Sequence, residues 1–542
     1  MSKSIKLAVL ATAALALPAL MPSAAFARGD DEGKGKFSRD QEIGYLGEFS
    51  TSVIAKNIRE RLENRREARR VSDTADRVLM WTEVALDANA LDHTPPSGGR
   101  AALSQGGPVR TARAFTMTQI AVFDAVNAFS GKFRPYNNIG SAPRRASLDA
   151  AIAYAAHDVL IALYPTQQAR IDLLLSSDVS RIGGSAASID AGKIVGQAAA
   201  AAILARRSAD GSQVSEVQFG AGGRVASGTT TYFGQPVNNG NGLAFNWSPD
   251  PLTPGATPGS VNGLALGANW GAVTPFVLAR GDQFRAPPPP MPGTVAYRAG
   301  WNEVKAIGAS SDTAGSTATA ATKFIGNYWG YDGAPLLGTP PRLYMQIAIQ
   351  LAKNNGVTGV AELSRYLAMV ATSMGDAGIA AWDSKYFYNY WRPVTGIRRG
   401  TEDGDAQTGA DAAWKPVGIS VLNTTNPILA TPPFPAYVSG HATFGAAVFE
   451  TIRGFIPNNT RFTFVSDEYN GTGVDPFGTP RPLVPVRFRS LEQAQEENGQ
   501  SRVYNGVHWI WDSTAGQNIG VSIGQYIPNH AFQRVRGERD DD

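Results

Sequence analysis

Apolar side chains recur at intervals of three and four residues along several stretches of this chain, which is the period of an amphipathic helix. The clearest examples are residues 114–129 and 150–164, in which the apolar positions form one stripe. A third stretch, 189–207, is rich in alanine, whose small side chain lets helices approach closely. We therefore predict packed helices in the first half of the chain, beginning near Val78.

Helical periodicity returns in the second half, starting at Ala320. Thr339 followed by two prolines is typical of a helix start, with the threonine hydroxyl as the cap. The patterns in 360–390, 442–456 and 506–526 predict further helices. No stretch alternates apolar and polar residues over any length, so no strand is predicted and the fold is expected to be mostly α.

The N-terminus has the pattern of a signal peptide. Lys3 and Lys6 precede the apolar run 7–20, and a small-residue motif ends at Ala27. Because this run is shorter than the roughly 20 residues that span a bilayer, we interpret 1–27 as a cleaved signal peptide. The protein is then expected to be exported, either periplasmic or secreted, with no membrane span in the mature chain.

Composition divides the rest of the chain. Mixed charges dominate 28–77, which we interpret as a solvated N-terminal arm. A helical region, 78–208, is followed by a loop-rich insertion, 209–319, in which Gly, Pro, Asn and Thr prevail. Residues 320–542 form the predicted C-terminal helical bundle. So long a connection inside a compact protein is either functional or an inserted spacer.

The overall composition excludes several functions. The 542 residues include no cysteine, which rules out disulfides, thiolate metal sites and a catalytic thiol. Metal chemistry would therefore have to use His, Asp or Glu. A formal net charge of +3 is too small, for a chain of this size, to make nucleic acid the expected partner.

The first of three chemically distinctive clusters contains Lys385 and, seven positions later, Arg392. On one continuous helix these positions share a face roughly 10 Å apart along the axis, so both cations could reach one anion. Aromatic residues such as Trp382 surround them, and burying unpaired cations there is costly. Pro393 disfavours α geometry at Arg392, so the helix could also end there. Alone, the pair fits surface cations with apolar stems as well.

The second cluster, residues 434–441, ends in Ser439, Gly440 and His441 at the start of a predicted helix. It places a hydroxyl, a small residue and an imidazole where backbone N–H groups and the helix dipole favour an anion. An ordinary serine cap beside a structural histidine fits the fragment equally well. No Gly-x-Ser-x-Gly nucleophile elbow is present.

The third cluster holds Arg502, His508 and Asp512. His508 and Asp512 are four positions apart, so Asp512 could bond one ring nitrogen and leave the other free as nucleophile or ligand. Arg502 adds a fork of donors that fits tetrahedral oxyanions. Taken alone, such a His–Asp pair is more often a local structural contact. The other histidines match no motif: His93, His157 and His530.

Together, Lys-x6-Arg-Pro, Ser-Gly-His and Ser-Arg-x5-His-x3-Asp resemble the signature shared by vanadium-dependent haloperoxidases and phosphatidic-acid-phosphatase-type acid phosphatases. The resemblance implies an all-α fold of helical bundles, with two units like four-helix bundles and long Gly/Pro-rich loops. It implies that the oxygens of vanadate or phosphate are held by five residues: Lys385, Arg392, Ser439, Gly440 and Arg502. One departure is Val438, where these proteins usually have proline before Ser-Gly-His.

The same resemblance implies roles for the histidines and their neighbours. His508, backed by Asp512, would be the nucleophile of a phosphatase or the vanadium ligand of a haloperoxidase. His441 would be the acid/base in either. Asp332 resembles the carboxylate that, in chloroperoxidases, bonds this acid/base and the arginine of the third cluster, here Arg502.

Features outside the shared pocket favour the haloperoxidase branch. A long helical region precedes the three clusters, whereas the small phosphatases fit them into a shorter chain. Trp382 and Phe434 are similar to the residues that line the halide side in vanadium chloroperoxidases. Bromoperoxidases generally carry His at the position of Phe434.

We therefore expect vanadate as the cofactor and hydrogen peroxide, a halide and a small organic acceptor as the partners. Chloride or bromide would be oxidised to a hypohalous species that halogenates the acceptor. An exported acid phosphatase with a phospho-histidine intermediate is the first alternative, and a non-catalytic exported helical binding protein with a relic site is the second. Bundle proteins of this type often pair, but no sequence feature selects a homodimer. The sequence leaves open the preferred halide, the organic substrate and the role of 209–319.

Overall fold

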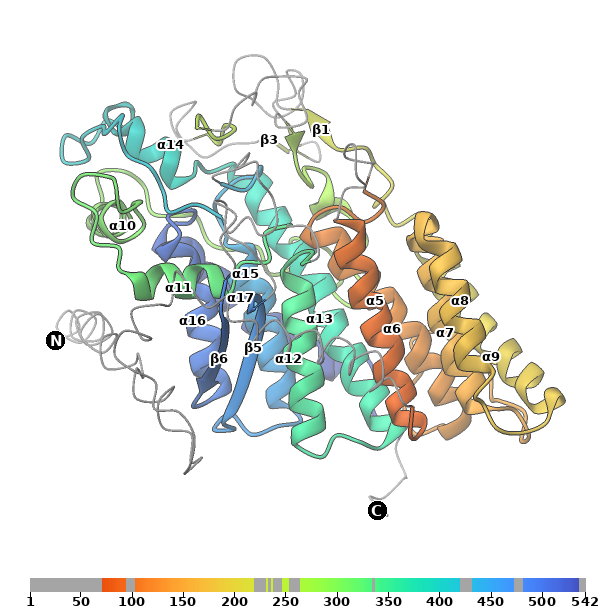
Figure 1. Cartoon of the computed structure of the whole chain (residues 1–542). Coiled ribbons are helices and arrows are strands. Elements are labelled where there is room, and N and C mark those ends of the chain that lie inside the picture. Colours follow the sequence, from red (N-terminus) through yellow and green to blue (C-terminus); the bar gives the residue numbers. More distant parts are fainter. Residues whose placement is uncertain are drawn as a thin grey trace, which may run out of the picture.

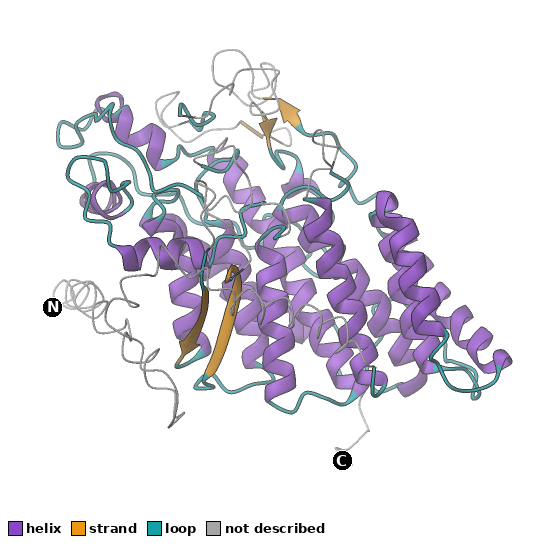
Figure 2. Ribbon diagram, viewed as in Figure 1, coloured by secondary structure: helices purple, strands orange, loops and turns teal. Residues whose placement is uncertain are grey.

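The computed structural model describes residues 71–93, 103–218, 231–232, 235–236, 246–252, 264–333, 337–419, 431–471 and 481–535. Helices dominate this part of the chain (Figures 1 and 2), so the prediction of an all-α fold is confirmed. The predicted signal peptide and most of the predicted arm, 28–77, lie outside the described residues.

The first group of helices comprises α5 (Thr74–Asp92), α6 (Pro108–Ser130), α7 (Leu148–Leu163), α8 (Gln168–Val179) and α9 (Ala186–Arg206), with a 3-10 turn, η2 (Pro165–Gln167), before α8. Helix α7 packs against α5, α6, α8 and α9, which run roughly side by side in Figure 1. Helix α6 is buried along most of its length, so it lies at the centre.

The second group comprises α10 (Val295–Ile307), α11 (Ala320–Tyr328), α12 (Pro340–Asn354), α13 (Val360–Tyr388), α14 (Pro393–Arg398), α15 (Gly440–Arg453), α16 (Leu491–Tyr504) and α17 (Ile510–His530), with 3-10 turns η4 (Trp270–Ala272) and η5 (Gly400–Asp403). Helix α13 packs against α6 of the first group and against α15 and α17 of the second. It therefore joins both groups through one continuous apolar core.

Among the described residues, three antiparallel two-stranded sheets pair β1 (Val217–Gln218) with β4 (Leu264–Ala265), β2 (Thr231–Tyr232) with β3 (Gln235–Pro236), and β5 (Phe462–Asn470) with β6 (Leu483–Phe488). The expectation of no strand was wrong, most clearly for β5 and β6. Successive residues near the end of β5 are buried on both faces because α11 and α12 pack against this strand. A strand covered in this way has no apolar–polar alternation to detect.

Other differences have local causes. Helix α10 lies inside the segment predicted to be loop-rich, and α8 and α16 were not predicted because their apolar stripes are narrow. Thr339 does precede α12, but its hydroxyl makes no cap bond. It donates instead to the Thr111 hydroxyl at 2.8 Å, tying α12 to α6.

Helix α9 packs very closely on α7. A Cβ added at Gly192 would lie 2.1 Å from the Ser147 carbonyl oxygen, and one at Gly196 would lie 2.3 Å from that of Ala151. Among the described helices, α9 is the one that is long and apolar enough to cross a membrane, with 33% of the tested window buried. A core helix passes the same test, so this property is weak evidence for a span.

His157 links α7 to α8 through both ring nitrogens. Its Nδ1 lies 2.7 Å from Asp158 Oδ1, and its Nε2 lies 2.8 Å from Asp172 Oδ1. Burial alone would lower the pKa of His157. Hydrogen bonds and charge attraction from the two carboxylates outweigh this effect, so the pKa lies above its ordinary value. The protonated ring is therefore a bridge between the two helices.

We predict that His157→Asn lowers the free energy of unfolding by roughly 1 kcal/mol at low pH, because the half-exposed Asp172 is screened by solvent. With the folded pKa raised, this stability is fully present below the unfolded pKa of about 6.5 and is lost as pH rises through the folded value. Urea unfolding across pH 5 to 9 should show the gap between wild type and variant shrinking. A gap that does not change with pH would contradict the bridge.

Candidate functional site

Lys385 and Arg392 do not share one helix face; of the two possibilities that the sequence left open, the structure shows the one in which the helix ends before Arg392. Helix α13 ends at Tyr388, Asn389 takes a left-handed conformation with φ 47°, and Arg392 is extended before α14. The break follows from Pro393, which excludes helical geometry at the preceding residue and begins the next helix. The two cations nevertheless come together, because the Lys385 Nζ and the Arg392 Cζ each lie 5.0 Å from the centroid of the Phe434 ring.

Lys385 is fully buried, and its ammonium group donates to the backbone carbonyls of Pro435, Ala436 and Val438. Burial and the charge of Arg392 lower the pKa of Lys385 well below its ordinary value. Lys385 thus fastens the loop that leads into Ser439 and brings a positive charge beneath it.

Arg392 connects the first cluster with the third. Its Nε donates to the Phe434 carbonyl at 2.9 Å and its Nη1 to the Val507 carbonyl at 2.6 Å. The same Nη1 lies 3.4 Å from His508 Nε2. On the far side of the ring, His508 Nδ1 lies 2.9 Å from Asp512 Oδ2. Asp512 therefore orients the imidazole, and Nε2 faces Arg392.

The four-residue spacing of His508 and Asp512 suggested a contact along one helix face. In the structure the two residues do not lie on one helix. Helix α17 begins at Ile510, so His508 precedes it, and the Asp512 carboxylate also accepts the Trp509 N–H in the first turn at 3.0 Å. Burial, and then the charges of Arg392, Lys385 and Arg502, lower the pKa of His508 well below its ordinary value. The ring is therefore neutral at neutral pH. Burial raises the pKa of Asp512 to about 7.

Arg502 and His441 both contact the segment that contains Gly330 and Asp332. Arg502 is fully buried and donates through Nη2 to Asp332 Oδ1 at 2.7 Å. His441 Nε2 lies 2.8 Å from the Gly330 carbonyl oxygen and 4.0 Å from Asp332 Oδ1. Because a carbonyl can only accept, Nε2 carries the proton and Nδ1 is the nitrogen that can take one up. Burial and the charge of Arg502 lower the pKa of His441 well below its ordinary value.

Ser439 and Gly440 form the start of α15, against the start of α17. The Ser439 side chain accepts the Ala442 N–H, and its own N–H donates to the Asp512 carbonyl at 2.9 Å. A Cβ at Gly516 of α17 would lie 2.7 Å from the Ser439 carbonyl oxygen, so glycine permits this approach. The N-terminus of α15 is thereby fixed next to His508.

Trp382 and Phe434 form an aromatic wall on the Lys385 side. Their ring centroids are 4.8 Å apart, with an interplanar angle of 52°. The Lys385 Nζ lies 5.4 Å from the Trp382 centroid. The side chains predicted from the three clusters, together with Asp332, therefore surround one buried region.

Sequence reasoning pointed to Asp332 but missed the residues that hold it. The strap, our name for residues 329–332, is fixed where Tyr331, with φ 48°, donates its N–H to Glu468 Oε1 at 2.7 Å. The Tyr331 hydroxyl also accepts the Asp467 N–H at 2.6 Å. At the other end, Trp329 Nε1 donates to Glu497 Oε1 at 3.0 Å. The available signal was an acidic pair, Asp467-Glu468, next to aromatic and β-branched residues in 462–469.

The donors of the site fit an oxyanion. Arg392 Nη2 and Arg502 Nε are buried and make no hydrogen bond in the structure. Unsatisfied buried guanidinium groups are costly, and a planar fork of N–H donors matches tetrahedral oxygens. Within the described ranges, no group of three or more His, Asp or Glu could hold a metal ion. The site is therefore suited to an anion held by cations.

This fold and site define a helical-bundle protein with a buried oxyanion pocket. Residues 365–537 match a family model described as the VCPO second helical-bundle domain. The vanadium chloroperoxidase of Curvularia inaequalis is 32% identical over 289 residues, which cover 46% of this chain and 46% of that protein. The chain thus matches about half the length of this curated relative.

Two solved structures show the same fold over more of the chain. A bacterial vanadium-dependent iodoperoxidase aligns with a TM-score of 0.62 at 20% identity, covering 86% of this chain and 98% of that one. The holo form of a bacterial vanadium-dependent chloroperoxidase aligns with a TM-score of 0.57 at 18% identity, covering 82% and 96%. The resemblance to vanadium-dependent haloperoxidases is confirmed.

We predict that Glu468→Ala weakens the binding of orthovanadate about tenfold, as expected when a partner behind a ligand is removed. Without Glu468 the Tyr331 N–H and the Arg481 guanidinium each lose an acceptor, so the strap that carries Asp332 toward Arg502 is less firmly fixed. Calorimetric titration of the purified variant measures the affinity. Glu468→Gln keeps an acceptor for the Tyr331 N–H and should retain most of the wild-type affinity for orthovanadate.

Glu402→Gln, in the exposed pair with Arg399, is the matched control for this prediction. It should bind orthovanadate like the wild type. Equal affinities of wild type and Glu468→Ala would show that the strap does not depend on Glu468.

Proposed function

We propose that this protein is a vanadate-dependent haloperoxidase that uses hydrogen peroxide to oxidise a halide to a hypohalous species, which halogenates a small organic acceptor. The observation that carries the proposal is the convergence of three buried cations on the neutral ring of His508. Arg392 Nη1 lies 3.4 Å from His508 Nε2, and the charges of Arg392, Lys385 and Arg502 all lower the pKa of this imidazole.

Vanadate is the proposed cofactor. Arg392 and Arg502 would bind its oxygens through the buried N–H groups that have no partner in the protein. Ser439 and the first N–H groups of α15 would add neutral donors and a favourable helix dipole. His508 would bond to vanadium through Nε2, since Nδ1 is engaged by Asp512. Bound vanadate supplies a Lewis acid that activates peroxide.

The protein's own residues would handle the protons and charge around this anion. His441 is neutral, so its Nδ1 can accept a proton from hydrogen peroxide. Lys385 supplies positive charge in a buried region, where fixed charges act most strongly on a reacting oxygen. Asp512 keeps the His508 ring oriented. The Trp382–Phe434 wall would border the halide.

Two further observations support this assignment over a phosphatase. The matched relatives are described as a chloroperoxidase or an iodoperoxidase. The Trp382–Phe434 wall also has no evident use in hydrolysis of a phosphate ester. We propose further that the protein acts after export, directed by the signal-peptide pattern in 1–27.

The deciding experiment assays one purified sample in two ways. With vanadate, hydrogen peroxide and chloride, bromide or iodide, we expect halogenation of an activated carbon acid that survives chelation of other metals. His508→Ala should lower this activity about a hundredfold or more, because it removes the bond to the cofactor. His530→Asn, at the exposed end of α17, should leave the activity unchanged.

The second assay offers an aryl phosphate without vanadate. Rapid hydrolysis inhibited by vanadate, with no halogenation, would replace the proposal by a phosphatase acting through His508. Absence of any vanadate affinity in the folded protein would instead indicate a binding protein with a relic site.

A further inference from the structure

The indole of Trp382 is held along one edge by a turn from a distant part of the chain. Trp382 Nε1 donates to the Leu266 carbonyl at 3.0 Å, and the Tyr386 hydroxyl donates to the same oxygen at 2.9 Å. The next residue, Gly267, has φ 75°, and a Cβ there would lie 2.4 Å from Trp382 Nε1. Only glycine fits this position without moving the ring.

Across the ring, Gly440 also approaches Trp382 closely. A Cβ at Gly440 would lie 3.1 Å from the indole carbon Cζ3. The ring is therefore enclosed by two glycines and by Phe434, so its position depends on where the turn 266–269 lies.

Glu216 ties this turn to helix α6. One carboxylate oxygen, Oε2, accepts the Gly267 N–H at 2.6 Å, and the other, Oε1, pairs with Arg110 Nη2 at 2.9 Å. The Arg110 guanidinium also lies 5.0 Å from the centroid of the Trp270 ring, just beyond the turn. Both sides of the turn are thus attached to one arginine of α6.

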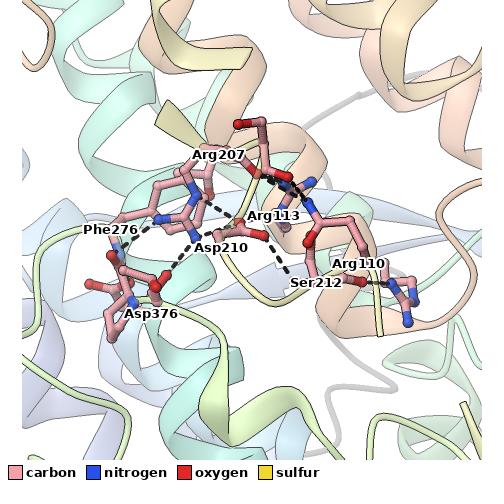
Figure 3. Close-up of polar contacts among 12 residues, drawn as sticks. Arg110, Arg113, Arg207, Asp210, Ser212, Phe276 and Asp376 are labelled. Atoms are coloured by element: carbon pink, nitrogen blue, oxygen red, sulfur yellow. Dashed lines mark hydrogen bonds and ion pairs between the residues drawn. The ribbon is translucent and has the colours of Figure 1, made fainter. Parts of the chain in front are cut away.

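Arg110 belongs to an extended polar network (Figure 3). It donates to the Ser212 carbonyl at 2.5 Å, and the Ser212 N–H donates to Asp210 Oδ1 at 3.0 Å. The other oxygen of Asp210 accepts from Arg113 at 2.7 Å and from Arg207 at 2.8 Å. The position of Arg110 is therefore set by several buried or half-buried bonds.

The network returns to α13, the helix that carries Trp382. Arg207 lies with its Cζ 3.9 Å from the Phe276 ring centroid, and the Phe276 N–H donates to Asp376 Oδ1 at 2.6 Å. Asp376 also accepts the Leu278 N–H at 2.9 Å. The turn is therefore linked to α13 twice, directly through Trp382 and indirectly through Asp376.

We propose that Gly267 and Glu216 are positioning residues for Trp382, and that they set the width of the halide site through the turn 266–269. This inference rests on the proposed function, since Trp382 borders a halide only if the site oxidises halides. The indole N–H is already used by Leu266, so Trp382 meets an anion through its ring carbons. The position of the Trp382 ring then determines how closely the halide fits. Displacement of the ring therefore weakens binding of the halide more than binding of the cofactor.

The test compares Gly267→Ala with Gly315→Ala. Both glycines have positive φ, 75° and 77°, but a Cβ at Gly315 meets nothing within 4 Å. The two variants therefore share the backbone strain, and the clash with Trp382 is confined to Gly267→Ala. We expect Gly267→Ala to raise the KM for halide about tenfold, with kcat, the KM for peroxide and the vanadate Kd within about twofold of wild type. Gly315→Ala should match wild type in all four.

Glu216 provides a second pair of variants, which serves if Gly267→Ala does not fold. Glu216→Ala removes the acceptor of the Gly267 N–H and should raise the halide KM in the same selective way. Glu216→Gln keeps an acceptor and should restore most of the wild-type value.

A crystal structure of the Gly267→Ala or Glu216→Ala protein gives a readout independent of activity, namely displacement of the Trp382 ring from Phe434. An unmoved ring, or a halide KM in Gly267→Ala equal to that of Gly315→Ala, would overturn the inference. Loss of vanadate affinity together with halide affinity would also overturn it, because the turn would then support the whole pocket. A wild-type protein that oxidises no halide would remove the proposed function, whereas a displaced ring would still show that the turn positions Trp382.

Discussion

The burial of three cations around one imidazole is the constraint on which this structure depends. Lys385, Arg392 and Arg502 are almost completely shielded from water, and moving a charge from water to such a place costs several kcal/mol unless it is compensated. Arg502 has Asp332, whereas Lys385 and Arg392 donate largely to backbone carbonyls. Burial accordingly lowers the pKa of Arg392 to about 9. In the proposed function, vanadate would supply further negative charge beside these cations.

Close helix packing makes this arrangement attainable. Three glycines of α17, at positions 516, 520 and 524, lie on one side, and a Cβ at any of them would come within 2.8 Å of a backbone oxygen of α15 or of its N-cap, Ser439. The two helices therefore approach nearly to backbone contact. Their starts bring Ser439 next to the residues around His508, so the pocket forms where two helix N-termini meet. Glycines bury little apolar side-chain surface in this interface. Most of the apolar surface is buried instead in the core along α13.

Local features of the site could be predicted from the sequence. The bond between His508 and Asp512 depends on residues four apart, and the cap at Ser439 depends on residues three apart. Such short separations leave the chain few alternatives. Even here the detail differed, because Pro393 ended a helix that would have aligned Lys385 with Arg392 on one face.

Distant partners could not be predicted in this way. Glu468 reaches Tyr331 from 137 positions away, and Glu216 reaches Gly267 from 51 positions away. Glu468 and Glu216 lie in no sequence motif. Their roles become visible only in the structure, where each accepts a backbone N–H. A pattern of spacing records which residues share an element, but not which elements meet.

The distinction between a phosphatase and a haloperoxidase likewise depends on distant partners rather than on the motif residues. Phosphate and vanadate present similar tetrahedral oxygens, so Lys385, Arg392 and Arg502 serve either, and the motif residues alone cannot separate the two chemistries. What differs is the space next to the oxyanion. There the strap places the Gly330 carbonyl 2.8 Å from His441 Nε2, which leaves Nδ1 as the nitrogen that would exchange protons in the proposed reaction. On the other side, the turn at Leu266 uses the Trp382 N–H and leaves only ring carbons toward the pocket. The aromatic wall of Trp382 and Phe434 therefore supports the proposed oxidation of a halide rather than the hydrolysis of an ester.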